Sequence, residues 1–333
     1  WSGVRCTNKK LWRILSLSLA VLCLGLPLGG CSRETKPEDA FTVDRPGFGI
    51  QEPGTDTAAA YYAEDLCVAA EDVKATDAEA QDALAACFFN LDTKEILYAK
   101  NIHGRMYPAS TTKIMTALLL LEQGGLDDQT TVSKEAITFH ESGVTTVKLK
   151  EGDVLSMDQL LHALLIVSAN DAANVIAEKV GGSVEQFAQM MNEKAASIGA
   201  TNTHFVNPHG LHDEEHYTTA YDLYLMFQEA MKHEEFLEVL QMPSYETTYL
   251  SAGGQEQAAT WSSTNRFTTG DVTVPDGVKA GGGTTGSTRA AMSCLGQLFE
   301  DAGGQRYVAI ILGASERSVL YQEMQGFLST LNN

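Results

Sequence analysis

The chain has 333 residues, of which 44% are hydrophobic, so it is long enough to bury a substantial core. It contains 43 acidic and 23 basic residues, which gives a formal net charge of −20. This negative charge argues against electrostatic binding to nucleic acid or to an anionic membrane surface. We therefore expect an acidic folded protein without a nucleic-acid partner.

Residues 1–30 have the composition of an export signal. They contain four basic residues and no acidic one, and an apolar run ends in small residues before Cys31. This ending resembles the lipobox of bacterial lipoproteins. The alternative is an uncleaved anchor, because about twenty apolar residues can cross a bilayer. We expect a signal peptide, lipid attached to Cys31, and an extracytoplasmic protein that this lipid anchors to the cytoplasmic membrane.

The chain after Cys31 divides into two parts. Residues 31–64 are predicted to be a flexible tether, because they are rich in Pro, Gly, Thr and acidic residues. Residues 65–333 are predicted to form one folded domain, with no separate domain after it. This part contains Cys67, Cys87 and Cys294, an odd number that cannot all pair. A Cys67–Cys87 disulfide and unpaired core thiols both remain open.

The folded part combines strands and helices. A hairpin is predicted over Leu84–Leu91 and Ile96–Lys100, followed by a helix over Ala109–Gln123 that two glycines end. Further helices are predicted at 157–167, 171–180, 184–198 and 220–232. Strands are predicted near 245–250, 258–262, 271–278, 288–299 and 306–313. A last helix carries Leu320, Met324, Phe327, Leu328 and Leu331 on one face. This order predicts an α+β fold with an inserted helical subdomain.

The segment Pro108–Lys113 reads PASTTK and opens the predicted helix at 109–123. Ser110 and Lys113 are three positions apart, so they lie on one face of its first turn. A serine hydroxyl becomes a nucleophile when a neighbour accepts its proton. A lysine can do this if burial and the helix N-terminus lower its pKa. By itself this spacing is weak evidence, since a capping serine and a solvated lysine would look the same.

A second polar motif, Ser168-Ala169-Asn170, interrupts two apolar helical segments. By itself it favours ordinary helix capping. The order of motifs carries more weight: S-x-x-K comes first, S-x-N follows 58 residues later, and a Lys/Thr/Gly segment lies near the C-terminus. This is the pattern of the penicillin-recognising serine enzymes.

The flanking sequence resembles the serine D-alanyl-D-alanine carboxypeptidases, the low-molecular-mass penicillin-binding proteins. The resemblance covers about residues 65–333. It implies an antiparallel sheet flanked by helices, with an inserted helical subdomain. The matching stretches are Asn101–Glu122, Leu160–Glu178, Phe205–Asp222 and Ser262–Phe267.

The resemblance also implies roles for individual residues. Ser110 would be the acylated nucleophile and Lys113 its general base, while Ser168 would pass a proton to the leaving D-alanine nitrogen. Asn170 would bind the substrate amide. The Ser110 N–H would form half of an oxyanion hole, and the strand with the third motif would supply the other half. The substrates would be peptidoglycan pentapeptide stems and the inhibitors β-lactams, with no cofactor or metal.

The third motif, normally Lys-Thr-Gly or Lys-Ser-Gly in this family, can be aligned in two registers. From upstream, Lys279 matches the motif lysine. From downstream, Thr285 and Gly286 match its end, and Thr284 replaces the lysine. Lys279 reaches the site only if Gly281–Gly283 forms a bulge. The substrate-binding candidates are therefore Asn170, Lys279, Thr285 and Gly286.

Two other patterns are rejected. The triglycine segment is not a P-loop, because Ser287 stands where the lysine after the last glycine is required. Four histidines could suggest a metal site, but their surroundings match a structural segment of the carboxypeptidases. They are His204, His209, His212 and His216.

Three functional hypotheses follow. The first is a serine peptidase that removes the terminal D-alanine. The second is a catalytically impaired lipoprotein that binds penicillin or cell wall, because the third motif is disturbed. The third is a class A-like β-lactamase, which we rank last because the second motif is Ser-Ala-Asn and no E-x-x-L-N segment follows it.

Overall fold

The computed structural model describes residues 63–332, which belong to one unit, Ala60–Asn333. The predicted signal peptide, Cys31 and nearly all of the predicted tether lie outside the described residues. Within 63–332, no helix is both long enough and apolar enough to span a membrane.

The main sheet has six strands in the order β1-β3-β2-β10-β9-β8, and every neighbouring pair is antiparallel. β8 is therefore an edge strand. The predicted hairpin at the start of the domain is confirmed as β2 and β3. The strand bounds are Val73–Lys74 (β1), Ala85–Asn90 (β2), Ile96–Lys100 (β3), Lys279–Thr288 (β8), Met292–Glu300 (β9) and Arg306–Ala314 (β10).

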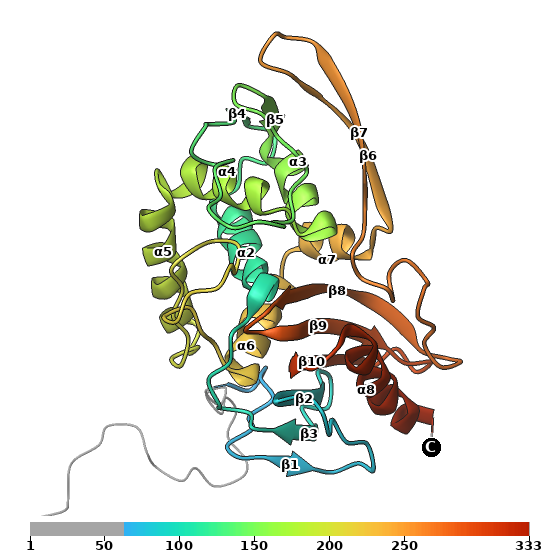
Figure 1. Cartoon of the computed structure of the whole chain (residues 1–333). Coiled ribbons are helices and arrows are strands. Elements are labelled where there is room, and N and C mark those ends of the chain that lie inside the picture. The colour runs from blue at the N-terminus through green and yellow to red at the C-terminus, as the bar shows by residue number, and fades with distance from the viewer. Residues whose placement is uncertain (1–62, 333) are drawn as a thin grey trace, which may run out of the picture. The chain divides into compact units, whose positions relative to one another are not determined.

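Both faces of this sheet are buried, because its strands alternate between two cores. On β2, Cys87 and Phe89 join the larger core, whereas Ala86 and Phe88 join the smaller one. The smaller core is covered by α8 (Arg317–Ser329), and α2 and α6 lie on the other side of the sheet (Figure 1). The α+β architecture predicted from the sequence is confirmed.

The larger core contains the helical subdomain, whose central helix is α2. Residues 113–120 of α2 are all buried. The predicted helices over residues 109–232 are confirmed, although the first two change type along their length. They are η2 (Ala109–Thr112), α2 (Lys113–Gln123), α3 (Met157–His162), η3 (Ala163–Val167), α4 (Asn170–Gly181), α5 (Val184–Ser197) and α6 (Ala220–Ala230). η2 is a 3-10 turn and η3 is a π-helix.

Other parts of the prediction are corrected. The segment 271–278 is not a strand, and the strand predicted at 288–299 is β9. β8 is the edge strand that the resemblance implied for the third motif, although the local pattern of residues predicted no strand over its glycine-rich length. A further helix, α7 (Glu234–Gln241), was not predicted.

A second sheet has four strands in the order β4-β5-β6-β7. The strands of this sheet are β4 (Gln129–Thr131), β5 (Val154–Ser156), β6 (Ser244–Leu250) and β7 (Glu256–Ser262). The β6–β7 hairpin extends away from the main sheet (Figure 1).

The three cysteines of the described chain are free. Cys67, Cys87 and Cys294 are all buried, and the Cys67 thiol donates to the Asn90 carbonyl oxygen. Burial raises the pKa of each of these thiols. Of the two open alternatives, the structure therefore contains unpaired core thiols.

Candidate active site

Ser110 and Lys113 lie together at the start of the central helix. Ser110 belongs to the 3-10 turn η2, and Lys113 is the first residue of α2. The Lys113 Nζ is 3.0 Å from the Ser110 Oγ. The S-x-x-K spacing thus brings hydroxyl and amine within hydrogen-bond distance.

The Lys113 amine is completely buried and is held by two acceptors. Its Nζ donates to Asn170 Oδ1 at 2.6 Å and to the main-chain oxygen of His209 at 2.8 Å. Burial lowers the pKa of Lys113 to about 7, although the Asp171 carboxylate favours the charged form. A neutral amine has two N–H groups and one lone pair. Since both N–H groups have acceptors, the lone pair is left for the Ser110 proton.

Ser168 and Asn170 occupy the break between two helices, as the sequence predicts. The π-helix η3 ends at Val167, and the next residue, Ser168, has a left-handed backbone with φ 63° and ψ 42°. α4 begins at Asn170, whose side chain reaches Lys113. The Ser168 hydroxyl is buried and has no hydrogen-bond partner among residues 63–332. A buried hydroxyl without a protein partner is available to hydrogen-bond to a bound molecule.

Asp171 joins the break between the two helices to the segment 145–149. Its carboxylate accepts the N–H groups of Val147 at 3.2 Å and Leu149 at 3.1 Å. The Asn170 N–H donates to the Thr145 oxygen at 2.9 Å. Burial raises the pKa of Asp171, and the N–H groups that it accepts oppose this shift. These bonds fix the backbone beside the Ser-Ala-Asn motif.

The edge strand β8 meets the nucleophile at a glycine. A Cβ at Gly286 would lie 2.6 Å from the Ser110 nitrogen and 3.0 Å from the Thr111 nitrogen, so only glycine permits this approach. Thr284 and Thr285 are buried, and the Thr285 Oγ1 is 3.0 Å from the Thr264 Oγ1. Of the two registers, the downstream one therefore lies beside Ser110.

The hypothesis that Lys279 enters the site is corrected. Lys279 precedes Gly286 by seven residues, or roughly 20 Å of extended strand. Its Nζ pairs with Glu300 Oε1 at 3.1 Å, and its side chain is 77% exposed. A bulge does occur in the triglycine segment, where Gly282 has a φ of +98°. It shifts the pairing by only one residue, which is too little to carry Lys279 to Ser110.

The resemblance includes Phe205–Asp222 but does not reveal that a loop of this segment forms the other wall of the site, where it packs against η2 and the first turn of α2. Besides the His209 oxygen, the Pro208 oxygen contacts this turn by accepting from Thr116 Oγ1 at 2.6 Å. Gly210 has a φ of +82°, and a Cβ there would lie 1.8 Å from the Ala109 oxygen. The Pro-His-Gly sequence is the only local signal for this wall. In the described part of the chain, no three His, Cys, Asp or Glu residues are arranged to hold a metal ion.

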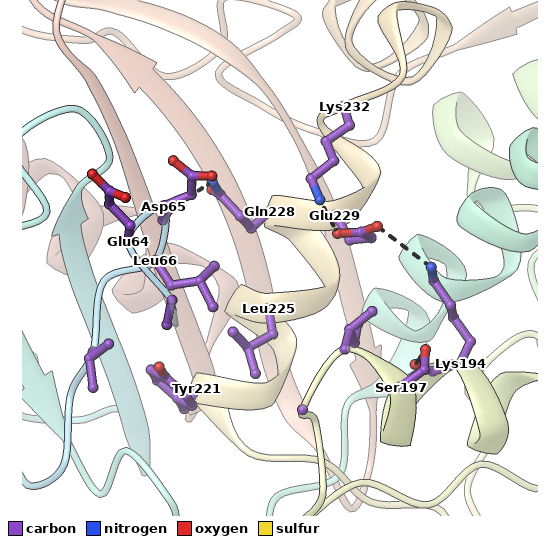
Figure 2. A pocket seen from close by; sticks show the side chains of 14 residues that line it. Glu64, Asp65, Leu66, Lys194, Ser197, Tyr221, Leu225, Gln228, Glu229 and Lys232 are labelled. Carbon is purple, nitrogen blue, oxygen red and sulfur yellow. Dashed lines mark hydrogen bonds and ion pairs between the residues drawn. The ribbon is translucent and has the colours of Figure 1, made fainter. Parts of the chain in front are cut away.

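A cavity of about 850 Å³ lies apart from these residues, between the first described segment and helices α5 and α6 (Figure 2). Leu66, Tyr221 and Leu225 form part of its apolar wall. At its rim, Lys194 and Glu229 form an ion pair of 3.6 Å. Neither the Ser-Lys pair nor the Ser-Ala-Asn motif lines this cavity, so it is separate from the candidate active site.

Comparison with protein families identifies relatives of the whole folded unit. The family model described as D-alanyl-D-alanine carboxypeptidase, peptidase S11, matches residues 72–316. A curated relative, D-alanyl-D-alanine carboxypeptidase DacF of Bacillus subtilis, is 35% identical over 268 residues, which cover 78% of this chain and 65% of that protein. The chain thus spans slightly less than two thirds of this relative.

Two further similarities come from Streptomyces strain K15. A D-alanyl-D-alanine carboxypeptidase is 31% identical over 236 residues, which cover 68% of this chain and 79% of that protein. The crystal structure of the K15 DD-transpeptidase matches with a TM-score of 0.69 and 28% identity. This match covers 75% of this chain and 96% of the K15 chain.

Proposed function

Because the chain belongs to the D-alanyl-D-alanine carboxypeptidase family, we propose that it removes the terminal D-alanine from peptidoglycan stem peptides through an acyl-enzyme at Ser110. The observation that carries this proposal is the position of the Lys113 amine. It is buried, lies 3.0 Å from the Ser110 hydroxyl, and has a pKa of about 7. An amine with this pKa is partly neutral near pH 7 and can accept the hydroxyl proton.

In the proposed acylation, the Ser110 Oγ attacks the carbonyl carbon of the penultimate D-alanine while Lys113 accepts its proton. Negative charge develops on the carbonyl oxygen, and the Ser110 N–H stabilises it; the close approach of Gly286 on β8 to the Ser110 nitrogen supports this role. The C–N bond then breaks, and Lys113 returns the proton that it took from Ser110 to the leaving nitrogen through the Ser168 hydroxyl, which leaves the amine neutral again. The unpaired Ser168 hydroxyl supports this role, because it is free to form a new hydrogen bond.

In deacylation, a water molecule attacks the ester on Ser110 and gives up a proton to Lys113. The peptide leaves with its new carboxyl end, and Ser110 recovers its hydroxyl proton. The amine therefore acts as a base in both half-reactions and returns to its starting state. Neither half-reaction needs a group beyond these side chains, the backbone N–H donors, the substrate and water.

The third motif sets how the substrate carboxylate binds. Thr284 occupies the place of the motif lysine, and Lys279 is directed to solvent instead. We infer that hydroxyl groups hold the carboxylate, with Thr285 as its donor beside Thr264. A neutral donor binds a carboxylate less strongly than an ammonium group does. A high KM for the peptide substrate is therefore part of the proposal.

The direct test is release of D-alanine from diacetyl-Lys-D-Ala-D-Ala. Ser110→Ala should abolish release, whereas the control Ser197→Ala, at an exposed hydroxyl on α5, should retain it. Because the similar K15 structure is that of a DD-transpeptidase, the assay should include an amine acceptor and measure both products. Absence of both products at every enzyme concentration would contradict the proposed activity. It would favour the second hypothesis, a catalytically impaired protein that binds penicillin or cell wall.

Two further parts of the proposal concern inhibitors and location. β-Lactams are proposed to acylate Ser110 and to be hydrolysed slowly, so a fluorescent penicillin should label the chain but not Ser110→Ala. Export and lipid attachment at Cys31 are proposed from the N-terminal sequence. Incorporation of a labelled fatty acid, and its loss in Cys31→Ala, tests the lipid anchor.

A further inference from the structure

Three contacts join the Pro208–Gly210 wall and the segment after it to η2 and the first turn of α2. Thr116 and Lys113 donate to main-chain oxygens of this wall. The third contact joins two side chains, because the Thr112 Oγ1 is 2.8 Å from the His216 Nε2. His216 is 2% exposed and Thr112 is 1% exposed, so water has almost no access to this contact.

The hydrogen bonds of His216 define which nitrogen carries the proton. The Val206 N–H donates to His216 Nδ1 at 3.2 Å, so Nδ1 is the unprotonated nitrogen. Burial lowers the pKa of His216 to about 3, which leaves the ring neutral with its proton on Nε2. The Nε2–H therefore donates to the Thr112 hydroxyl, which in turn donates to the Ala109 oxygen at 2.8 Å.

This chain of hydrogen bonds ends on the peptide group that joins Ala109 to Ser110. A peptide group is planar and trans, so its C=O and N–H point in opposite directions. Anchoring the Ala109 oxygen on one side therefore fixes the direction of the Ser110 N–H on the other. That N–H belongs to the nitrogen that lies against Gly286 on β8.

The backbone before this peptide needs such support. Ala109 has a φ of +48°, a conformation that residues with a Cβ rarely adopt. Ala109 is the first residue of η2, and this turn has no side-chain cap at its N-terminus. The hydrogen bond from Thr112 and the close approach of Gly210 both act on the Ala109 oxygen. The surrounding structure thus holds a strained backbone directly beside the nucleophile.

We propose that His216 and Thr112 are a positioning pair, which fixes the Ala109–Ser110 peptide and aims the Ser110 N–H at the oxyanion of the reaction. The proposal rests on the proposed function, since that function supplies the oxyanion. Neither residue touches the substrate. Their contribution appears in the transition state, where the negative charge develops, more than in substrate binding.

The first test compares matched variants of Thr112 in the full chain. Thr112→Val removes the hydroxyl at nearly constant volume, and Thr112→Ser retains it. Loss of an oxyanion donor costs about 10²–10³ in kcat, so a misdirected donor should cost Thr112→Val about tenfold or more, with KM within about twofold. Thr112→Ser should remain within about threefold of the original kcat.

The second test separates the two nitrogens of His216. Gln can place an N–H donor near the position of Nε2, whereas Asn can place an acceptor near that of Nδ1. His216→Gln should therefore retain more activity than His216→Asn or His216→Phe. If His216→Asn is fast and His216→Gln is slow, the Val206 contact matters and the Thr112 contact does not, which overturns the proposal.

Acylation by a fluorescent penicillin provides a second rate that does not depend on peptidase turnover. If the unmodified chain labels but releases no D-alanine, the proposed peptidase function fails, and the labelling rates of the variants still decide the positioning role. Melting temperatures are measured in parallel. The positioning role is overturned if Thr112→Val and His216→Phe melt earlier but label at rates within twofold of the unmodified chain.

Discussion

The Lys113 amine and the Asn170 side-chain oxygen lie 2.6 Å apart, although 57 positions separate the two residues in the sequence. Asn170 is uncharged, so it orients the amine without adding to the negative charge that would favour its protonation. Together with the main-chain oxygen of His209, it leaves the lone pair of a neutral Lys113 directed to Ser110.

The pH dependence of kcat/KM should therefore have an acid limb near pH 7. The protonated amine cannot accept the Ser110 proton, so activity falls as pH drops below the pKa of Lys113, which is about 7. The expected slope is about tenfold per pH unit below that value, with a plateau above it. Lys113→Arg serves as the control, because arginine remains charged and should be inactive throughout. A flat profile between pH 5 and 8 would contradict the role of Lys113.

Asn170→Asp should move this limb to higher pH. A carboxylate 2.6 Å from the amine favours the charged form, which raises the pKa of Lys113 by about one unit or more. At pH 7 the variant should be less active, and part of the activity should return at pH 9. The measurement is the same kcat/KM profile. An unchanged midpoint would show that Asn170 does not contact the catalytic amine in solution.

Gly286→Ala should block acylation while the protein remains folded. The added Cβ would lie 2.6 Å from the Ser110 nitrogen, so β8 must move away from the nucleophile. A displacement of about 1 Å can cost about a hundredfold in rate. The control is Gly326→Ala, on α8, where a Cβ meets no atom within 4 Å. This control should keep full activity and gain up to about 1 kcal/mol in unfolding free energy.

Ser168→Ala should separate stability from activity. The Ser168 hydroxyl is buried and unpaired in residues 63–332, so its removal should leave the unfolding free energy unchanged or raise it by about 1 kcal/mol. The same change should lower D-alanine release by about 10²–10³, because the leaving nitrogen loses its proton donor. Denaturant unfolding and D-alanine assays give the two values. A marked loss of stability would mean that the hydroxyl has a partner in solution.

Lys279→Ala should have little effect. Its ion pair with Glu300 is exposed, and such pairs contribute about 0–1 kcal/mol. Turnover and penicillin labelling should remain within about twofold of the original values. A tenfold loss of turnover would instead support the upstream alignment of the third motif, in which Lys279 binds the substrate carboxylate. Glu300→Ala is the matched control, since it breaks the same ion pair from the other strand.

Much of the fold follows from local patterns in the sequence. The β2–β3 hairpin and the helices α2, α4, α5, α6 and α8 were predicted from local sequence, and four of these helices have a glycine or a capping Ser or Thr at one end (α2, α4, α5 and α6). The S-x-x-K pair also follows from local spacing, because one helical turn is enough to bring Ser110 and Lys113 together. These features depend on neighbours a few positions away.

The features that could not be predicted depend on distant contacts. The register of β8 is hidden because Gly281–Gly283 have no side chains, so no alternation marks which residues face inward. The β-branched residues of 271–278 suggested a strand there, whereas the real edge strand is glycine-rich: Gly286 passes close to Ser110, and Gly281–Gly283 pack closely against Leu240 and β9. The His209 oxygen is a main-chain group, which no residue type reveals.

The free thiols have a practical consequence for producing the protein. Cys67, Cys87 and Cys294 form no covalent cross-link, so non-covalent contacts hold residues 63–332 together. Folding of this unit therefore does not require an oxidant or a disulfide isomerase. The same unit should be obtained from a reducing bacterial cytosol, where its activity can be assayed without the membrane.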